Sequence, residues 1–192
     1  MAEKLDLSKF REAAVLVPIV LQDDVPHLLF TERSQVVEHH KGQICFPGGA
    51  RDACDSHLYQ TALRETEEEV GLNASNIILL GKLPLEFTPS YYKIQPFVAV
   101  IKPFAFDELR YANDEIASVF LTPLSHFADP DKLTLINKDF FGHSLQVPYF
   151  EHPTHSIWGA TGRMIINLLK AMHITSSHKD LNLGPVHLDS QF

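Results

Sequence analysis

Short apolar segments and two longer amphipathic segments alternate along the chain. The short segments are rich in Val, Ile, Leu and Phe and have the length of β-strands. The two longer segments carry apolar residues at intervals of three and four, the spacing of one helix face. The pattern predicts two helices, residues 57–70 and 157–172, and six strands, residues 13–21, 27–31, 43–46, 77–83, 94–101 and 118–121.

The predicted helices have recognisable ends. Gly71 is a natural C-terminal breaker for the first helix, and Asp55 or Ser56 is expected to cap its start. Ser156 directly precedes the second helix. Aromatic and aliphatic residues indicate a further hairpin over residues 137–150. Strands before, between and after two helices predict an α/β or α+β layered domain with helices packed on a sheet.

Length and composition favour a single domain. The chain has 192 residues, of which 45% are hydrophobic and 21% charged, and it shows no internal repeat or linker. The longest apolar segment, residues 13–21, is interrupted by Pro18 and is far shorter than the roughly 20 residues of a membrane helix. Two cysteines and no secretory pattern lead us to expect a cytoplasmic protein.

The charge balance narrows the range of partners. The formal net charge is −8, so the overall field repels nucleic acid and anionic membranes, and we expect neither as a partner. A phosphate ligand must therefore be bound by local groups such as backbone N–H donors, a few arginines or divalent cations.

The residues most suggestive of chemistry lie between positions 46 and 72, where a strand, a Gly48-Gly49 loop and an acidic helix follow one another. On the helix, Glu65, Glu68 and Glu69 share one sector beside an apolar ridge. Carboxylates at i and i+4 repel each other, and Mg²⁺ or Mn²⁺ would neutralise them. A solvated acidic face is the alternative, but the glycine pair directly before the helix favours a ligand site.

This segment resembles the Nudix hydrolase family. Residues 64–72 read RETEEEVGL and match the second half of the Nudix box, Arg-Glu-U-x-Glu-Glu-x-Gly-U with U bulky and aliphatic, except for Thr66. The first half differs. Five residues lead from Gly49 to Asp55, where the box has Glu, and eight rather than seven residues separate Asp55 from Arg64. We therefore assign no role to Asp55.

The resemblance implies a fold and a metal site. The fold would be an α/β/α sandwich with a mixed β-sheet, in one domain over residues 1–192 with its core at about 12–170. Glu65, Glu68 and Glu69 would bind Mg²⁺ or Mn²⁺, and Glu68 and Glu69 would also be catalytic.

Four further roles are expected from the same resemblance. Glu115 is the candidate catalytic base or additional metal ligand, with an exposed loop acid as the nearly equal reading and the adjacent Asp114 as the alternative candidate. Arg33 is a candidate for binding a substrate phosphate, and the Gly48-Gly49 backbone would line the phosphate site. Arg64 would orient the carboxylates.

A second resemblance concerns the substrate. Residues 29–34 (LFTERS), Gly42 and residues 46–49 (FPGG) follow the spacing of the coenzyme A pyrophosphatase branch, with Phe30 in place of Leu and Glu38 in place of Arg. Residues 156–163 (SIWGATGR) are also similar. This implies hydrolysis of the pyrophosphate bond of coenzyme A or its derivatives to 3′,5′-ADP and 4′-phosphopantetheine.

Three alternatives remain open. The Glu38 departure leaves room for another nucleoside diphosphate derivative, such as ADP-ribose or a dinucleotide. A non-catalytic nucleotide-binding module would keep the fold without turnover. An RNA-processing Nudix enzyme would need an RNA-binding surface, which the acidic sequence does not indicate. The sequence predicts no oligomeric state.

Other polar and aromatic residues give weaker indications of function. His152 and His155, like the pair at residues 39–40, lack a third and fourth ligand at a recognisable spacing, so zinc is not predicted. Cys45 lies in an apolar strand and is expected in the core. Aromatic clusters such as residues 104–106 are read as core or loop residues rather than a base-stacking site.

Overall fold

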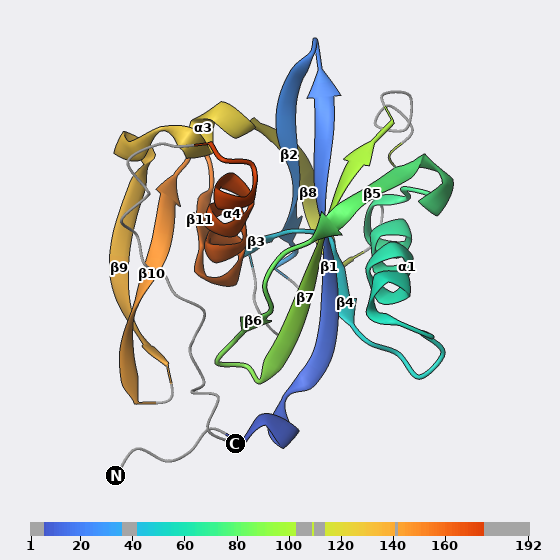
Figure 1. Cartoon of the computed structure of the whole chain (residues 1–192), viewed down its shortest axis with the longest axis horizontal. Helices are drawn as coiled ribbons and strands as arrows, with labels where there is room; N and C mark the ends of the chain where they lie inside the picture. Colours follow the sequence, from blue (N-terminus) through green and yellow to red (C-terminus); the bar gives the residue numbers. More distant parts are fainter. Residues whose placement is uncertain (1–5, 36–41, 103–108, 110–113, 141, 175–192) are drawn as a thin grey trace.

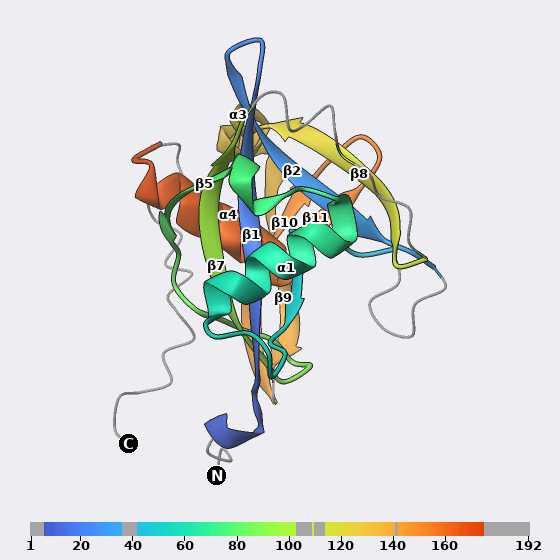
Figure 2. The same cartoon turned by 90° about the vertical axis from the view of Figure 1, so that its right-hand side faces the viewer.

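In a computed structural model of the chain, a large mixed β-sheet separates two groups of elements (Figure 1). Helix α1 covers one face, and helix α4 with a small three-stranded sheet covers the other, so that α1 lies in front of the sheet and α4 behind it in Figure 2. The structure describes residues 6–35, 42–102, 109, 114–140 and 142–174. The strands are β1 (Arg11–Gln22), β2 (Val25–Arg33), β3 (Ile44–Cys45), β4 (Gly48–Ala50), β5 (Ile77–Lys82), β6 (Glu86–Phe87), β7 (Tyr92–Ile101), β8 (Ile116–Pro123), β9 (Leu133–Phe140), β10 (His143–Glu151) and β11 (Ser156–Trp158), and the α-helices are α1 (Leu58–Val70), α3 (Leu124–Ala128) and α4 (Gly159–Ala171).

Strands β1 and β7 form the parallel centre of the large sheet. They pair from Arg11 opposite Tyr92 to Val20 opposite Ile101. The strand order along the sheet is β3-β2-β1-β7-β5. In addition, β4 pairs with β1, β6 pairs with β7 and β8 pairs with β2. Apart from β1 and β7, all of these neighbours pair in antiparallel orientation. Because both faces of β1 are covered, its residues 13–20 are all buried, which explains a continuous apolar run instead of an alternating one.

Two hydrophobic cores lie on the two faces of the sheet. Leu29 packs on the α1 side with Val70, whereas its neighbours Leu28 and Phe30 pack on the α4 side with Ile165. This follows from the alternation of side chains along a strand. The same alternation places Arg33 and Glu32, at the end of β2, on opposite faces.

The predicted elements are found, with two corrections at helix starts. His57, rather than Asp55 or Ser56, caps α1, because its Nδ1 accepts the Gln60 N–H at 3.0 Å while Asp55 binds elsewhere. The second helix begins at Gly159, since Ser156–Trp158 pair with β10 as a strand. The expected end of α1 is confirmed: Gly71 has the left-handed φ of 70° that favours glycine.

The predicted hairpin is also present as β9 and β10, and it forms the small sheet together with β11. Among the described residues, no helix has the length and apolar character needed to cross a membrane.

Candidate active site

Glu69 is the most enclosed of the predicted metal ligands. It lies on the α1 face that packs toward β4, and only 5% of its side chain is exposed. Its Oε2 accepts a hydrogen bond from the backbone N–H of Gly48 at 3.0 Å. The Arg33 Nη1 lies 3.8 Å from its Oε1, while the buried Arg33 Nε has no hydrogen-bond partner within the described structure. Arg33 thus contributes a positive charge and an unused donor beside the carboxylate.

Burial and neighbouring negative charges disfavour the anionic form of two of these carboxylates. Burial raises the pKa of Glu69 to about 7, while Gly48 N–H and the Arg33 charge oppose the shift and Glu65 and Glu115 add to it. The pKa of Glu65 is raised too, mainly by burial. Since a bound cation stabilises carboxylates that are desolvated and crowded, these groups have the character of hard-metal ligands.

Arg64 connects four neighbouring groups. Its Nε and Nη2 donate to the two Asp55 oxygens at 3.1 and 3.0 Å, and its Nη1 donates to Glu65 at 2.9 Å and Glu68 at 3.1 Å. Its Nη2 also donates to the Ala50 carbonyl at 3.2 Å. Arg64 therefore joins the loop after β4 to the carboxylate face of α1.

Asp55 is the residue whose role the sequence left open. Its side chain is fully buried, and the Arg64 guanidinium holds the pKa of this carboxyl well below its usual range. The signal in the sequence was an acid near the first Nudix glutamate position, shifted by one residue and shortened by one methylene. In this chain Asp55 accepts hydrogen bonds from the arginine that also donates to Glu65 and Glu68.

Gly48 and Gly49 are each required by close packing, but against different elements. Gly48 has a φ of 151°, and a Cβ there would collide with the Ala14 carbonyl and Val15. A Cβ on Gly49 would instead collide with the Glu65 carboxylate. Gly48 thus lets β4 lie close to β1, and Gly49 lets β4 approach the acidic face of the helix.

Glu115 lies in the turn before β8, where its carbonyl accepts the Ser34 N–H at 2.7 Å. The pairing of β2 with β8 places Ile116 opposite Arg33. The negative charge of Glu115 adds to the raised pKa values of Glu65 and Glu69, so Glu115 lies near these helix carboxylates. Asp114 is also exposed in this turn.

The donor chemistry fits Mg²⁺ or Mn²⁺, since carboxylate oxygens next to a glycine backbone are what these ions bind. The carboxylates are held by protein groups: Arg64 holds Glu65 and Glu68, and Gly48 holds Glu69. Within the described residues, no three His, Cys, Asp or Glu side chains are close enough to enclose a metal ion. The ligand roles therefore stay a prediction, and Glu68, with 59% of its side chain exposed, is the most accessible of the three.

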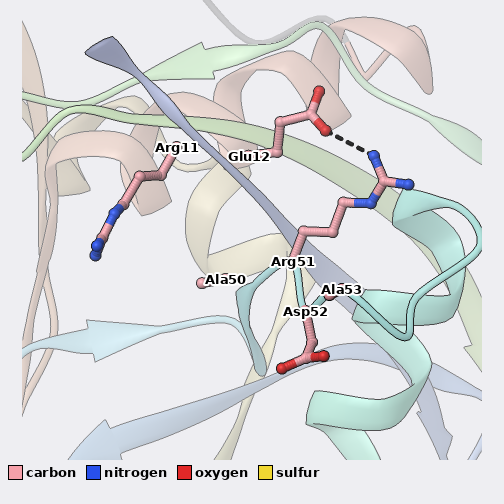
Figure 3. Close-up of a pocket in the computed structure, with 6 residues that line it drawn as sticks. All are labelled: Arg11, Glu12, Ala50, Arg51, Asp52 and Ala53. Carbon is pink, nitrogen blue, oxygen red and sulfur yellow. Dashed lines mark hydrogen bonds and ion pairs between the residues drawn. The ribbon is translucent and has the colours of Figure 1, made fainter.

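A surface pocket of about 600 Å³ lies next to the glycine loop. Figure 3 shows Arg51 reaching to Glu12, whose Oε2 is 2.8 Å from the Arg51 Nη1, while Arg11 extends away from that pair. Ala50 lines this pocket and also accepts the Arg64 hydrogen bond. The pocket therefore adjoins the carboxylate site, a neighbourhood that the sequence gave no reason to expect. Its lining residues are Arg11, Glu12, Ala50, Arg51, Asp52 and Ala53.

Some residues discussed from the sequence lie outside the described part of the chain. These are Glu38, the histidines at 39–40, the aromatic residues at 104–106 and Phe141. Cys45 is part-buried in β3 beside Thr31, and burial raises its pKa to about 11, which fits the expected packing role.

Comparison with known proteins identifies the family. The model of the NUDIX domain matches residues 10–141. The chain belongs to the Nudix family. Relatives called uncharacterized Nudix hydrolase NudL are 36% identical over 163 residues in Escherichia fergusonii, covering 82% of this chain and 81% of that protein, and 36% identical over 170 residues in Yersinia pestis, covering 85% and 81%.

Solved structures agree on the Nudix fold. A MutT/nudix family protein from Enterococcus faecalis has a TM-score of 0.55 at 17% identity and covers 85% of this chain and 63% of that one. The Ap4A hydrolase of C. elegans in a binary complex has a TM-score of 0.50 at 18% identity, covering 59% and 80%. The predicted α/β class with a mixed sheet is confirmed, and the family assignment supports pyrophosphohydrolase activity.

Proposed function

We propose that this Nudix hydrolase cleaves the pyrophosphate bond of coenzyme A or its derivatives, in the presence of Mg²⁺ or Mn²⁺, to 3′,5′-ADP and 4′-phosphopantetheine. The observation that carries the reaction class is the buried Glu69 carboxylate, which accepts the Gly48 N–H and lies one helical turn after Glu65 on the acidic helix. The observation that supports the proposed substrate is the spacing of residues 29–34, Gly42 and 46–49, which resembles the coenzyme A pyrophosphatase branch.

The chain's own groups divide the work of the reaction. Glu65, Glu68 and Glu69 would hold the cation, and Arg64 keeps Glu65 and Glu68 on one side of the helix. When bound, Mg²⁺ or Mn²⁺ neutralises phosphate charge and lowers the pKa of a coordinated water molecule. Glu115 is proposed to accept a proton from the attacking water, for which a carboxylate facing the same site is suited.

Arg33 is proposed to bind a substrate phosphate. Among the described residues its buried Nε has no hydrogen-bond partner, and its Nη1 is 3.8 Å from Glu69, longer than a charge-assisted hydrogen bond. The Arg33 side chain is 26% exposed, so its guanidinium group is proposed to meet a phosphate oxygen next to the carboxylates. The same charge also stabilises ionised Glu69.

The pocket beside Ala50 is proposed to receive the phosphate of the substrate that is not cleaved. Coenzyme A carries a 3′-phosphate in addition to its pyrophosphate, and the pocket contains two arginines, Arg11 and Arg51, alongside the acids Glu12 and Asp52. Arg51 is already paired with Glu12, so Arg11 is the better side chain to test.

This assignment has a substrate-specific test. Arg11→Gln should raise the KM for coenzyme A up to about fivefold, since an exposed ion pair contributes at most about 1 kcal/mol. The KM for 3′-dephospho-coenzyme A, which lacks the group, should not change. An equal rise for both substrates, or for neither, would remove the pocket from the substrate site.

The substrate class is tested by a panel of coenzyme A, ADP-ribose and Ap4A at equal Mg²⁺, compared by kcat/KM. Ap4A is included because a structural neighbour is named as its hydrolase. The largest kcat/KM is expected for coenzyme A. A preference for ADP-ribose or Ap4A would keep the reaction class and replace the substrate, whereas saturable binding without cleavage would favour the non-catalytic nucleotide-binding module.

A further inference from the structure

Two histidines meet on the face of the sheet opposite the carboxylate site. His152 and His155 lie in the connection between β10 and β11 and pack against Phe120 of β8. The His155 ring stacks on the Phe120 ring, with 3.9 Å between centroids and 2° between planes. Both rings are therefore held by the fold instead of extending freely into solvent.

The two rings turn the same nitrogen toward each other. The Nδ1 atoms of His152 and His155 are 3.3 Å apart, whereas the ring centroids are 5.1 Å apart. The hydroxyl oxygen of Thr154 lies 2.7 Å from the Nδ1 of His155 and 3.4 Å from that of His152. Ligands bound at about 2.0–2.1 Å to one tetrahedral metal ion lie roughly 3.3–3.4 Å apart, so the two nitrogens already have the spacing of a metal-bound pair.

The far nitrogens of both rings have polar partners. The Nε2 of His152 is 3.3 Å from the Thr122 hydroxyl, and the Nε2 of His155 is 3.7 Å from the Glu32 Oε2. The Ser118 hydroxyl in turn donates to the same Glu32 oxygen at 2.8 Å. Metal-binding histidines commonly place their second nitrogen against a carboxylate or hydroxyl in this way, which fixes the ring and increases its basicity.

The histidine pair opens to a surface pocket of about 380 Å³, which leaves room for water molecules on a bound ion. A third histidine, His126, contacts His152 edge-on, but its Nε2 is bonded to the Glu151 carbonyl at 2.7 Å. Since the described residues contain no group of three such side chains able to hold a metal, the site has two protein nitrogens and otherwise solvent ligands. The pocket is lined by Tyr149, Glu151, His152, Thr154, His155 and Ser156.

We infer that His152 and His155 bind a divalent transition-metal ion through their Nδ1 atoms, at a site separate from the proposed Mg²⁺ or Mn²⁺ site. Imidazole nitrogens select Zn²⁺, Ni²⁺ or Cu²⁺ over Mg²⁺, which prefers oxygen. Glu32, next to this pair, and Arg33, next to Glu69, extend from opposite faces of β2. The spacing in the sequence did not predict the site because Glu32, Thr122 and Phe120 reach the histidines only through strand pairing.

Zinc binding to the full-length chain tests the inference. After removal of metals by chelation, Zn²⁺ is titrated by calorimetry in buffer that contains excess Mg²⁺, which occupies carboxylate sites that would otherwise bind Zn²⁺. Wild type should bind one Zn²⁺, and His152→Ala and His155→Ala should each abolish this binding. His143→Ala, which changes an exposed histidine of β10, is the matched control and should bind as wild type does.

Two further measurements do not depend on the folding of the histidine variants. Glu32→Gln should weaken Zn²⁺ binding by about tenfold, because loss of a group that supports a metal ligand typically costs about 10–100-fold in affinity. In the wild-type chain, Zn²⁺ should shift the Nδ1 nitrogen resonances of two imidazoles in long-range ¹H–¹⁵N spectra. Absence of Zn²⁺ binding in Mg²⁺ buffer, binding that survives both alanine variants, or shifts confined to Nε2 atoms would overturn the inference.

Discussion

At the scale of single residues, the surroundings of each glutamate on α1 differ more than its position in the motif indicates. Glu67, Glu68 and Glu69 are consecutive, yet Glu69 is buried against Gly48 whereas Glu67 is exposed and bonded to Asn73. The free energy needed to keep the carboxylate ionised therefore differs between these positions. A carboxylate that is buried with only a distant opposite charge, here the Arg33 guanidinium at 3.8 Å, is typical of a functional site.

Replacement of Glu69 by Gln tests this difference. Glu69→Gln keeps the side-chain shape but removes the charge, so kcat should fall by about two orders of magnitude or more if Glu69 holds the cation. The fold should remain, because burying a neutral amide costs less than burying a charge. Steady-state kinetics and the melting temperature measure both effects. Glu67→Gln is the matched control, and wild-type activity in Glu69→Gln would remove Glu69 from the site.

Asp55 gives a prediction about stability and pH. Asp55→Asn should lower the free energy of unfolding by about 3 kcal/mol, because it leaves Arg64 without its buried partner. The folded pKa of Asp55 lies below its ordinary value of 3.8, so its stabilising contribution is present above about pH 4 and is lost as the pH falls. Urea unfolding of both proteins at pH 3 and pH 7 measures this. A stability difference that is as large at pH 3 as at pH 7 would contradict it.

The sequence was sufficient to predict the relative placement of the glutamates and Arg64, because these residues lie on one helix and the helical period determines their common face. It was insufficient for Asp55, since that residue lies in the loop before α1, where no period applies. Only the fold shows that its carboxylate reaches Arg64 nine residues later.

At the scale of elements, the close contact between β4 and α1 determines where the carboxylates point. Gly48 donates its N–H to Glu69, and Gly49 leaves the space that the Glu65 carboxylate occupies. A three-residue strand is too short to show a period of two, so the sequence predicted the glycine loop but not β4. The missed β11 has the same cause, since its three residues were absorbed into the following helix.

A methyl group at Gly49 probes this contact. Gly49→Ala should displace the Glu65 carboxylate and lower kcat by about a hundredfold, the effect of a displacement of about 1 Å at a reacting centre. Single-turnover kinetics separates this effect from product release. Gly81→Ala in β5 is the control, because a Cβ there meets no atom within 4 Å. If Gly49→Ala were as active as Gly81→Ala, the site would not depend on this approach.

At the scale of the whole molecule, a buried ion pair joins α4 to the large sheet. Arg163 donates to Glu86 of β6 at 2.7 Å, and Asn167 donates to the other Glu86 oxygen at 3.0 Å. Glu86 is 1% exposed, and its burial raises the pKa of this carboxyl to about 7. Residues 156–163, which resemble the coenzyme A pyrophosphatase branch, therefore end in Arg163, the residue that connects α4 to the large sheet.

Removal of this arginine should loosen the layers. Arg163→Met is expected to lower the free energy of unfolding by about 3–5 kcal/mol, because Glu86 loses the partner that offsets its burial. Lys82→Met, at an exposed position of β5, should change it little. Chemical denaturation at pH 7 measures both variants, and equal stabilities would show that the pair contributes nothing.

The same pair has a defined pH dependence. The folded pKa of Glu86 is about 7 against an ordinary value of 4.5, so the folded chain holds a proton there that the unfolded chain has lost. The contribution of Glu86 to stability is therefore full below about pH 4.5 and declines as the pH rises through 7. Arg163→Met should steepen this decline between pH 5 and pH 8, and an unchanged slope relative to wild type would contradict the assignment.

The pairing of strands in the sheet could not be predicted from the sequence. Strand positions were predicted from apolar runs, but β1 pairs in parallel with β7, whose residues lie 81 positions later in the chain, as Arg11 opposite Tyr92 shows, and no periodicity identifies that partner. The layered α/β class followed from the order of elements, whereas the arrangement of Glu115 and Arg33 beside Glu69 depends on the pairing of β2 with β8.

The most direct measurement is incubation of the purified chain with coenzyme A and Mg²⁺ or Mn²⁺, followed by mass-resolved analysis of the products, with EDTA in a parallel sample. The account predicts metal-dependent appearance of 3′,5′-ADP together with 4′-phosphopantetheine. Coenzyme A that remains intact under these conditions would contradict it.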